Sequence, residues 1–169
     1  MLGLEKLNLN TKVEILHFPP KMKDNTFFED HWQELLELVR YLEKVQDKVQ
    51  LPIVTTTKVI DKKVVFSEWD PTHTVVALIN NKVVGYMVVD YNPQRPDTIT
   101  IVYISVLPEY HKRGIGTKLI DKVYDVIDTL DVKINYVLLD VAIKNKQAMN
   151  LYNKLGFKPL SSWMYLKVK

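Results

Sequence analysis

The sequence predicts a mixed α/β fold of the α+β kind, in which one domain spanning 1–169 has a central, mostly antiparallel sheet with flanking helices. Three observations predict this fold. Short β-type runs follow one another from 74 to 107, helical spacing of apolar residues recurs before and after them, and an apolar run at 136–143 lies between two helical stretches. With 169 residues and 47% hydrophobic content, the chain can bury one core.

The first predicted elements are a strand and a long helix. Residues 12–18 (KVEILHF) alternate as a strand does and stop at Pro19-Pro20. Residues 27–49 carry apolar residues at helical spacing with charges between them, which predicts a helix packed on the core. Its apolar face is expected to consist of Phe28, Trp32, Leu35, Leu36, Val39, Leu42 and Val49.

An antiparallel meander of three strands is expected next. The runs TVVALI (74–79) and VVGYMVVDY (83–91) are separated by a tight turn at Asn80-Asn81 with Lys82, and the loop NPQRPD leads into TITIVYISVL (98–107).

The last predicted elements surround one further strand. The pattern predicts a helix at about 114–130, the strand YVLLDVAI at 136–143, and a helix at about 146–155 that Gly156 ends. A final extended tail, SSWMYLKV, would leave an exposed strand edge that is compatible with a homodimer.

Composition excludes several classes of site. The 23 basic and 20 acidic residues are interspersed and give a formal charge of +3, so the chain lacks the broad positive field of a dedicated nucleic-acid-binding protein. The absence of cysteine excludes disulfides, thiolate metal sites and a cysteine nucleophile. The four histidines have no metal-ligand spacing, so no metal is expected. No segment has the length and apolarity of a signal peptide or a membrane span, which predicts a cytoplasmic protein without a membrane partner.

The segment HKRGIGT, His111–Thr117, joins a predicted strand to a predicted helix and contains two glycines. Glycines let the backbone turn sharply and leave the N–H groups of Arg113–Thr117 without side chains in front of them. With the helix dipole, and with Lys112, Arg113 and Lys118 at the rim, such a turn attracts phosphate. A plain strand-to-helix turn with solvated cations explains the segment equally well, and the spelling matches neither a P-loop nor a Rossmann turn.

A second candidate group lies downstream. Asn145 follows the last predicted strand, and Tyr152 comes seven residues later, two turns along a helix, so both can face the same side of the junction. There they would flank a ligand. The simpler interpretation is that Asn145 caps the helix and Tyr152 packs inside it.

Over about residues 74–160 the chain resembles the GNAT superfamily of acetyl-CoA-dependent N-acetyltransferases. The family's pyrophosphate loop reads Q/R-x-x-G-x-G/A, and this chain has H-K-R-G-I-G. The family's later pattern is matched by Asn145, Ala148, Leu151-Tyr152 and Gly156-Phe157. His111 departs from the pattern, and since backbone N–H groups make most of the phosphate contacts, this departure bears on cofactor affinity more than on cofactor identity.

The resemblance implies a GNAT-like domain with acetyl-CoA as the acyl-donor cosubstrate, bound where the central strands 98–107 and 136–143 splay apart. The backbone of Ile104–Val106 would bind the pantetheine arm as an added strand does, and the glycine-containing loop would bind the pyrophosphate. The residues expected to bind the cofactor are Ile104, Ser105, Val106, His111, Lys112, Arg113, Gly114, Ile115, Gly116, Thr117 and Asn145.

The implied reaction moves the acetyl group to a primary amine: a protein N-terminus, a lysine or a small amine. An amine attacks a thioester only when neutral, and a lysine-type amine has a pKa of about 10.4, so a base removes a proton directly or through water. Asp140 matches the place of a glutamate base in some members, provided that its side of the strand lines the cleft. A bound water, Glu109, Asp90 or an acceptor that arrives neutral are the alternatives.

For the leaving group, Tyr152 matches the family's general acid, which protonates the departing thiolate. With no cysteine and no G-x-S-x-G elbow, direct attack by the amine is favoured over an acyl-enzyme.

Two other functional classes stay open. One is a non-catalytic acyl-CoA sensor with the same cleft. The other is a nucleic-acid-binding module whose phosphate contacts would be Lys112, Arg113, Lys118 and Lys122. Carboxylates on the same predicted helix argue against this module, namely Asp121, Asp125 and Asp128.

Overall fold

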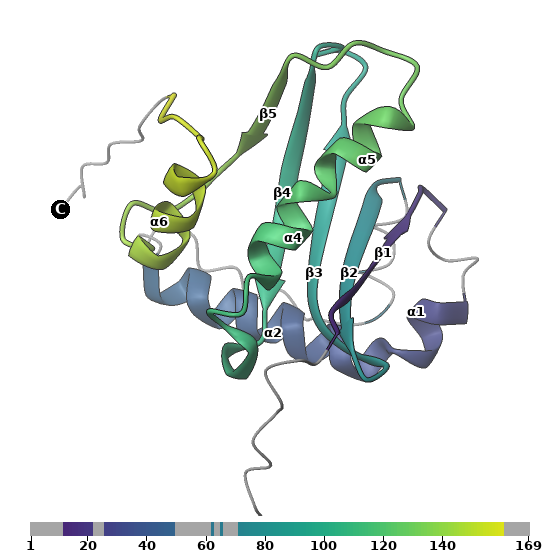
Figure 1. The fold of residues 1–169 in the computed structure, drawn as a ribbon, viewed down its shortest axis with the longest axis vertical. Coiled ribbons are helices and arrows are strands. Elements are labelled where there is room, and N and C mark those ends of the chain that lie inside the picture. The colour runs from purple at the N-terminus through teal and green to yellow at the C-terminus, as the bar shows by residue number, and fades with distance from the viewer. Residues whose placement is uncertain (1–11, 22–25, 50–61, 63–64, 66–70, 161–169) are drawn as a thin grey trace, which may run out of the picture.

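The computed structural model describes residues 12–21, 26–49, 62, 65 and 71–160, which form one sheet with helices on both faces (Figure 1). Along the chain the elements are β1 (Glu14–Phe18), α1 (Thr26–Asp30), α2 (Trp32–Val49), β2 (His73–Ile79), β3 (Lys82–Tyr91), β4 (Thr98–Val106), the 3₁₀ turn Pro108–Tyr110, α4 (Ile115–Asp121), α5 (Val123–Asp128), β5 (Tyr136–Leu139) and α6 (Lys146–Lys154). The mixed α/β fold predicted from the sequence is confirmed.

The strands lie in chain order across the sheet, β1-β2-β3-β4-β5. The first three pairings are antiparallel, as the predicted meander requires, and β4 pairs with β5 in parallel. The parallel pairing is short: it joins Thr98–Ile101 to Tyr136–Leu139 and ends there. Among the residues that the structure describes, no strand therefore lies beside the second half of β4 on that edge.

The turn between β2 and β3 confirms the tight turn predicted at Asn80-Asn81. Both asparagines have positive φ, 51° and 63°, as in a two-residue type I′ hairpin, and asparagine tolerates this left-handed backbone better than most residues do.

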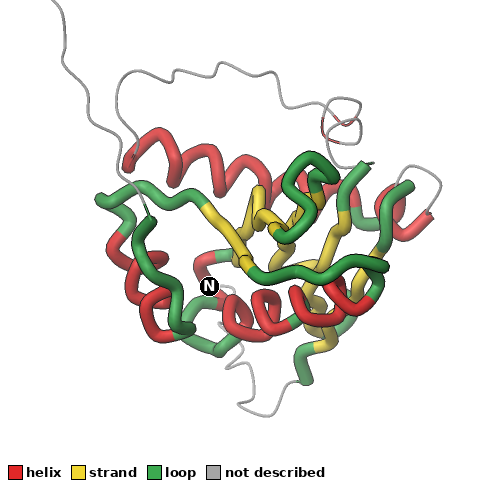
Figure 2. Tube along the Cα trace, turned by 90° about the horizontal axis from the view of Figure 1, so that it is seen from above, coloured by secondary structure: helices red, strands yellow, loops and turns green. Residues whose placement is uncertain are grey.

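The core lies on both faces of the sheet. Figure 2 shows helices on either side of the strands: α2 packs against β3 and β4, whereas α4 packs against β2, β3 and β4 on the opposite face. From α2 the buried residues are Leu35 and Leu38, and from α4 they include Leu119. The predicted apolar face of α2 omitted Leu38, although this side chain is fully buried.

Three predicted elements have different bounds in the structure. The strand predicted at 136–143 ends at Leu139, because its pairing with β4 stops there and no other described strand takes up the backbone hydrogen bonds beyond it. The helix predicted at 114–130 is α4 followed by α5; at Lys122 the N–H bonds to the carbonyl of Leu119, a tighter 3₁₀-type turn. The helix predicted at 27–49 is likewise divided into α1 and α2 at His31, whose imidazole is bonded to Glu34.

Some predictions concern parts of the chain or properties that the structure does not test. The extended C-terminal tail, and with it the homodimer through that tail, lies outside the described residues. The single domain over 1–169, the cytoplasmic location and the absence of a metal stay predictions. None of the helices in the described ranges is long and apolar enough to cross a bilayer. Within the same ranges, no three His, Asp or Glu side chains come together as a metal site would require.

A histidine pair that the sequence did not indicate joins β1 to β2. His17 Nε2 lies 3.0 Å from His73 Nδ1, and the two rings are stacked with centroids 5.2 Å apart. Burial, followed by the neighbouring His17, lowers the pKa of His73 from 6.5 to about 4. Burial also lowers the pKa of His17, with Lys122 acting in the same direction and Asp125 against it.

The pair makes stability depend on pH. Below a pH of about 6.5, His73 becomes protonated in the unfolded chain but not in the folded chain. The free energy of unfolding therefore falls as the pH decreases toward about 4. We expect His73 to account for a loss of about 1–2 kcal/mol across this window, less than the full shift would give because the imidazole is partly solvated and part of the shift comes from His17. Urea unfolding of the parent and of His73→Gln at pH 7.5 and pH 4.5 checks this, because carboxylate titration is common to both. An equal pH dependence in the two proteins would contradict it.

Candidate active site

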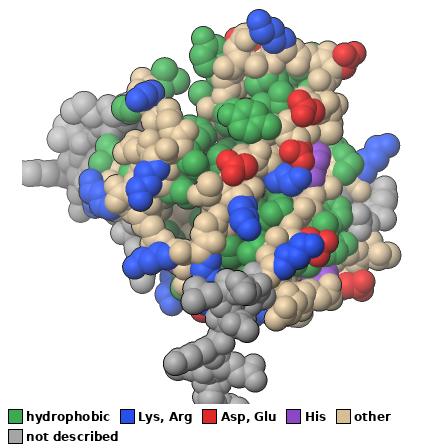
Figure 3. Space-filling model, in the orientation of Figure 1, with side chains coloured by type: hydrophobic (Ala, Val, Ile, Leu, Met, Phe, Trp, Pro, Cys, Tyr) green, Lys and Arg blue, Asp and Glu red, His purple; other side chains and the backbone are tan. Residues whose placement is uncertain are grey.

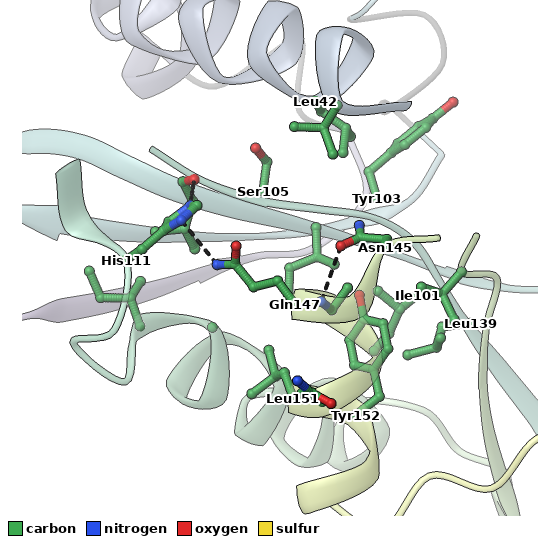
Figure 4. A pocket seen from close by; sticks show the side chains of 18 of the residues that line it. Leu42, Ile101, Tyr103, Ser105, His111, Leu139, Asn145, Gln147, Leu151 and Tyr152 are labelled. Carbon is green, nitrogen blue, oxygen red and sulfur yellow. Dashed lines mark hydrogen bonds between the residues drawn. The ribbon is translucent and has the colours of Figure 1, made fainter. Parts of the chain in front are cut away.

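The short pairing of β4 with β5 opens a cavity of about 580 Å³ between the second half of β4 and α6. Its wall is made by the C-terminal part of α2, by β4, by the turn between β4 and α4, by the loop after β5, and by α6. Figure 4 shows side chains from all of these segments converging on the space. The structure thus brings together the two groups of residues that the sequence singled out separately.

The unpaired edge of β4 presents backbone groups to the cavity. Leu107 donates its N–H to the carbonyl of Val84 in β3, and the backbone groups of every second residue before Leu107 point toward β3 as well. The backbone N–H and carbonyl groups of Ile104 and Val106 point the other way, toward the cavity. The backbone of Ser105 faces β3, and its buried hydroxyl donates to the Leu38 carbonyl of α2 at 3.3 Å.

Two residues of the turn leading into α4 have a left-handed backbone conformation. Lys112 has a φ of 59° and Gly114 a φ of 74°. A Cβ atom at Gly114 would have nothing within 4 Å, so the glycine leaves open space there. The first N–H that bonds back into α4 is that of Lys118, to the Gly114 carbonyl. The N–H groups before it belong to the start of the helix, where intrahelical acceptors are lacking.

Positive charge gathers around this turn and α6. Figure 3 shows Lys and Arg side chains in this part of the face, with carboxylates higher on it, over α5. The guanidinium of Arg113 lies 5.4 Å from the centroid of the Tyr110 ring, outside the cavity lining, whereas Lys112 and Lys154 are part of that lining. Lys122, one of the four cations considered as phosphate contacts of a nucleic-acid-binding module, forms an ion pair with Asp125.

Asn145 and Tyr152 lie on the α6 side of the cavity. Asn145 Oδ1 accepts a hydrogen bond from the Ala148 N–H at 3.2 Å, so it caps α6 and also lines the cavity. Tyr152 is buried, with its ring tilted against Phe157, and burial raises the pKa of its phenol to about 12. In Figure 4 the hydroxyl end of Tyr152 points from α6 into the cavity.

Asp140 lines the cavity, but it lies in the loop directly after β5 and its side chain is exposed. The strand alternation on which its predicted orientation depended therefore does not extend to it. Of the two carboxylates considered as alternatives, neither Glu109 nor Asp90 is part of the described lining.

His111 makes contacts that the motif did not predict. Its Nε2–H donates to the Val106 carbonyl at 2.7 Å, and its Nδ1 accepts from the side-chain amide of Gln147 at 3.0 Å. The ring lies edge-on to Tyr41 of α2, with centroids 6.0 Å apart. No motif in the sequence indicated Gln147 or Tyr41, because their relevance depends on how α2 and α6 pack around the turn.

The cavity lining includes both predicted catalytic residues, Tyr152 and Asp140. It also includes every predicted cofactor-binding residue except Arg113, namely Ile104, Ser105, Val106, His111, Lys112, Gly114, Ile115, Gly116, Thr117 and Asn145. Their roles are not tested by this placement and stay predictions.

Comparison with known proteins gives three similarities. A family model for the acetyltransferase (GNAT) family matches residues 32–157. N-alpha-acetyltransferase 30 of Schizosaccharomyces pombe is 29% identical over 92 residues, which are 53% of this chain and 59% of that protein. Thialysine N-epsilon-acetyltransferase of Bos taurus is 40% identical over 81 residues, 47% of this chain and 46% of that protein. The chain thus matches only about half of the length of these curated relatives.

Among solved structures, a tetramutant of a Bacillus halodurans protein superposes with a TM-score of 0.71 at 17% identity, covering 92% of this chain and 99% of that one. At this identity the likeness concerns the fold alone.

Proposed function

Because the chain belongs to the GNAT family of acetyltransferases, we propose that it transfers the acetyl group of acetyl-CoA to a primary amine, within the single domain that the sequence predicts. The observation that carries the proposal is the cavity at the divergence of β4 and β5, in which the glycine turn, Asn145 and Tyr152 meet. Acetyl-CoA supplies an acyl group activated as a thioester.

The residues present fit this cosubstrate. Ile104 offers its backbone N–H and carbonyl, and Val106 offers its N–H, along a strand edge that no described strand pairs with, which suits the amides of a pantetheine arm. The Val106 carbonyl already accepts a hydrogen bond from His111. The turn around Gly114 offers open space and N–H groups at the start of α4, and Lys112 adds positive charge there.

The chain's part in the chemistry is to move two protons. The amine nitrogen forms a bond to the acyl carbon and the carbon–sulfur bond breaks. The sulfur leaves as the thiolate of CoA, whose thiol has a pKa of roughly 8.5. With its pKa raised to about 12, Tyr152 stays protonated at neutral pH and can donate its hydroxyl hydrogen toward the sulfur. Since no cysteine is present, we propose direct attack without an acyl-enzyme.

The amine's proton leaves in the opposite direction. Among the described lining residues Asp140 is the one carboxylate, and it is exposed, so we propose that it accepts the proton through water. An exposed carboxylate is a weak base at neutral pH, which limits how much it contributes.

The acceptor is proposed to be a protein N-terminus, a lysine or a small amine. The named relatives support amine acceptors, since by their names one acetylates an α-amine and the other the ε-amine of thialysine. The test is release of CoA from acetyl-CoA in the presence of peptides with varied first residues, lysine, thialysine and diamines. Binding of acetyl-CoA without release by any of these amines would favour the acyl-CoA sensor instead.

Asp140→Asn is expected to lower turnover about tenfold at neutral pH, because the variant cannot take a proton. Turnover is measured from pH 5.5 to pH 9 at saturating acetyl-CoA, with Glu109→Gln as a matched control outside the cavity lining. If Asp140→Asn keeps the parental turnover across this pH range, the proton goes to water alone or the acceptor arrives neutral.

A further inference from the structure

We propose that His111 and Gln147 form a side-chain bridge that holds the glycine turn and the end of β4 at a fixed distance from α6, and so positions this turn for CoA. The inference rests on the proposed function of the cavity. It makes both residues positioning residues and assigns a role to Gln147, which no motif indicated.

The hydrogen bonds of His111 fit one tautomer of the neutral imidazole. The Val106 carbonyl oxygen can only accept, so Nε2 of His111 carries the hydrogen in the 2.7 Å contact. In the neutral ring Nδ1 is then an acceptor, and the Gln147 amide N–H donates to it at 3.0 Å. One neutral imidazole thus satisfies a strand carbonyl and a helix side chain at the same time.

The bridge spans the cavity where strand pairing cannot. Pairing of β4 with β5 ends at Ile101 and Leu139, and from there to the turn no β-ladder links β4 to the chain that leads into α6. Of the two dashed contacts of His111 in Figure 4, one holds the imidazole to the end of β4, and the other, to Gln147, reaches α6 across this gap. The Tyr41 ring of α2 lies edge-on to the imidazole, so four segments meet at this one side chain.

The bridge also explains how histidine can replace the glutamine or arginine of the family pattern. Its part here is to join the turn to its neighbours, which requires one donor and one acceptor and no positive charge. Gln147 has no competing role in the start of α6, because Asn145 already caps that helix.

Gln147 is exposed, so Gln147→Leu removes the bridge without disturbing the core or the helix cap. We expect CoA to bind about fivefold to tenfold more weakly to this variant in calorimetry, the effect of losing roughly one hydrogen bond. His111→Ala should lose a similar factor. The double variant should lose less than the product of the two single losses, because both remove the same bridge. His111→Gln, which has a donor and an acceptor, should bind CoA more tightly than His111→Ala.

Steady-state kinetics distinguish positioning from general damage. The KM for acetyl-CoA should rise in Gln147→Leu while kcat at saturation stays within about twofold, because Tyr152 on the same helix is not displaced. Gln33→Leu, an exposed glutamine of α2 outside the cavity lining, should keep the parental KM and dissociation constant.

Three outcomes would each contradict the proposed bridge. The losses of the two single variants could multiply in the double variant, the CoA affinity could stay unchanged, or kcat could fall in parallel with the rise in KM. If the parent protein binds CoA and the variants bind it with the same affinity, the bridge alone is refuted. A parent protein that does not bind CoA refutes the proposed function and the bridge together.

Discussion

Tyr152→Phe is expected to lower turnover about 100-fold while leaving the affinity for acetyl-CoA close to that of the parent. The ring of Tyr152 is buried against Phe157 and its hydroxyl end points into the cavity, so the substitution removes one oxygen and keeps the packing. Because burial raises the pKa of this phenol to about 12, the group is present as a donor throughout the neutral range. The loss should therefore be the same at pH 7 and at pH 9.

The measurement is turnover under conditions where the chemical step limits the rate, with calorimetry of CoA binding on the same preparations. Tyr110→Phe is the matched control: this tyrosine is also buried and lines the cavity, but lies in the turn before α4. Equal turnover of Tyr152→Phe and the parent would mean that Tyr152 only packs, which is the simpler of the two interpretations of the sequence.

Gly114→Asp is expected to weaken binding of acetyl-CoA about 100-fold. Two effects add. A residue with a Cβ atom is strained at the φ of 74°, at a cost of about 1 kcal/mol, and a carboxylate in the open space of the turn repels a pyrophosphate. The turn lies at the surface and Gly114 is exposed, so the fold should tolerate the change.

Gly114→Asn separates the two effects, because asparagine has the shape of aspartate without its charge and tolerates left-handed backbone. We expect asparagine to cost about tenfold less affinity than aspartate. Calorimetry with CoA at low and high salt provides the readout, and the difference between the two variants should shrink as salt rises. If both folded variants bind CoA as the parent does, the pyrophosphate does not lie at this turn.

The elements that the sequence predicted well are those whose patterns are local. The meander follows from alternation, and the turn at Asn80-Asn81 follows from the left-handed preference of asparagine. The placement of Asn145 and Tyr152 on the same cavity also agrees with their spacing along α6. These features depend on residues within a few positions of one another.

What the sequence missed depends on contacts across the fold. The apolar run that follows Asp140 has the composition of a strand, but β5 stops at Leu139 because β4 diverges from it. The pairing of His17 with His73 joins residues 56 positions apart, and Gln147 meets His111 across 36 positions. No local pattern encodes such distances, and without them neither the exposure of Asp140 nor the bridge could be anticipated.

The short β5 also has a consequence for local stability. β2 is buried along its whole length and β3 along most of it, whereas β5 has four residues, pairs with β4 alone among the described strands, and begins at an exposed Tyr136. Segments with few buried contacts open at a lower free energy than the global unfolding of the domain. The cavity wall formed by β5 and α6 is therefore expected to open at a lower free energy than the wall formed by β4. A ligand that contacts both walls raises the opening free energy of the β5–α6 wall first, in proportion to the logarithm of the ligand concentration.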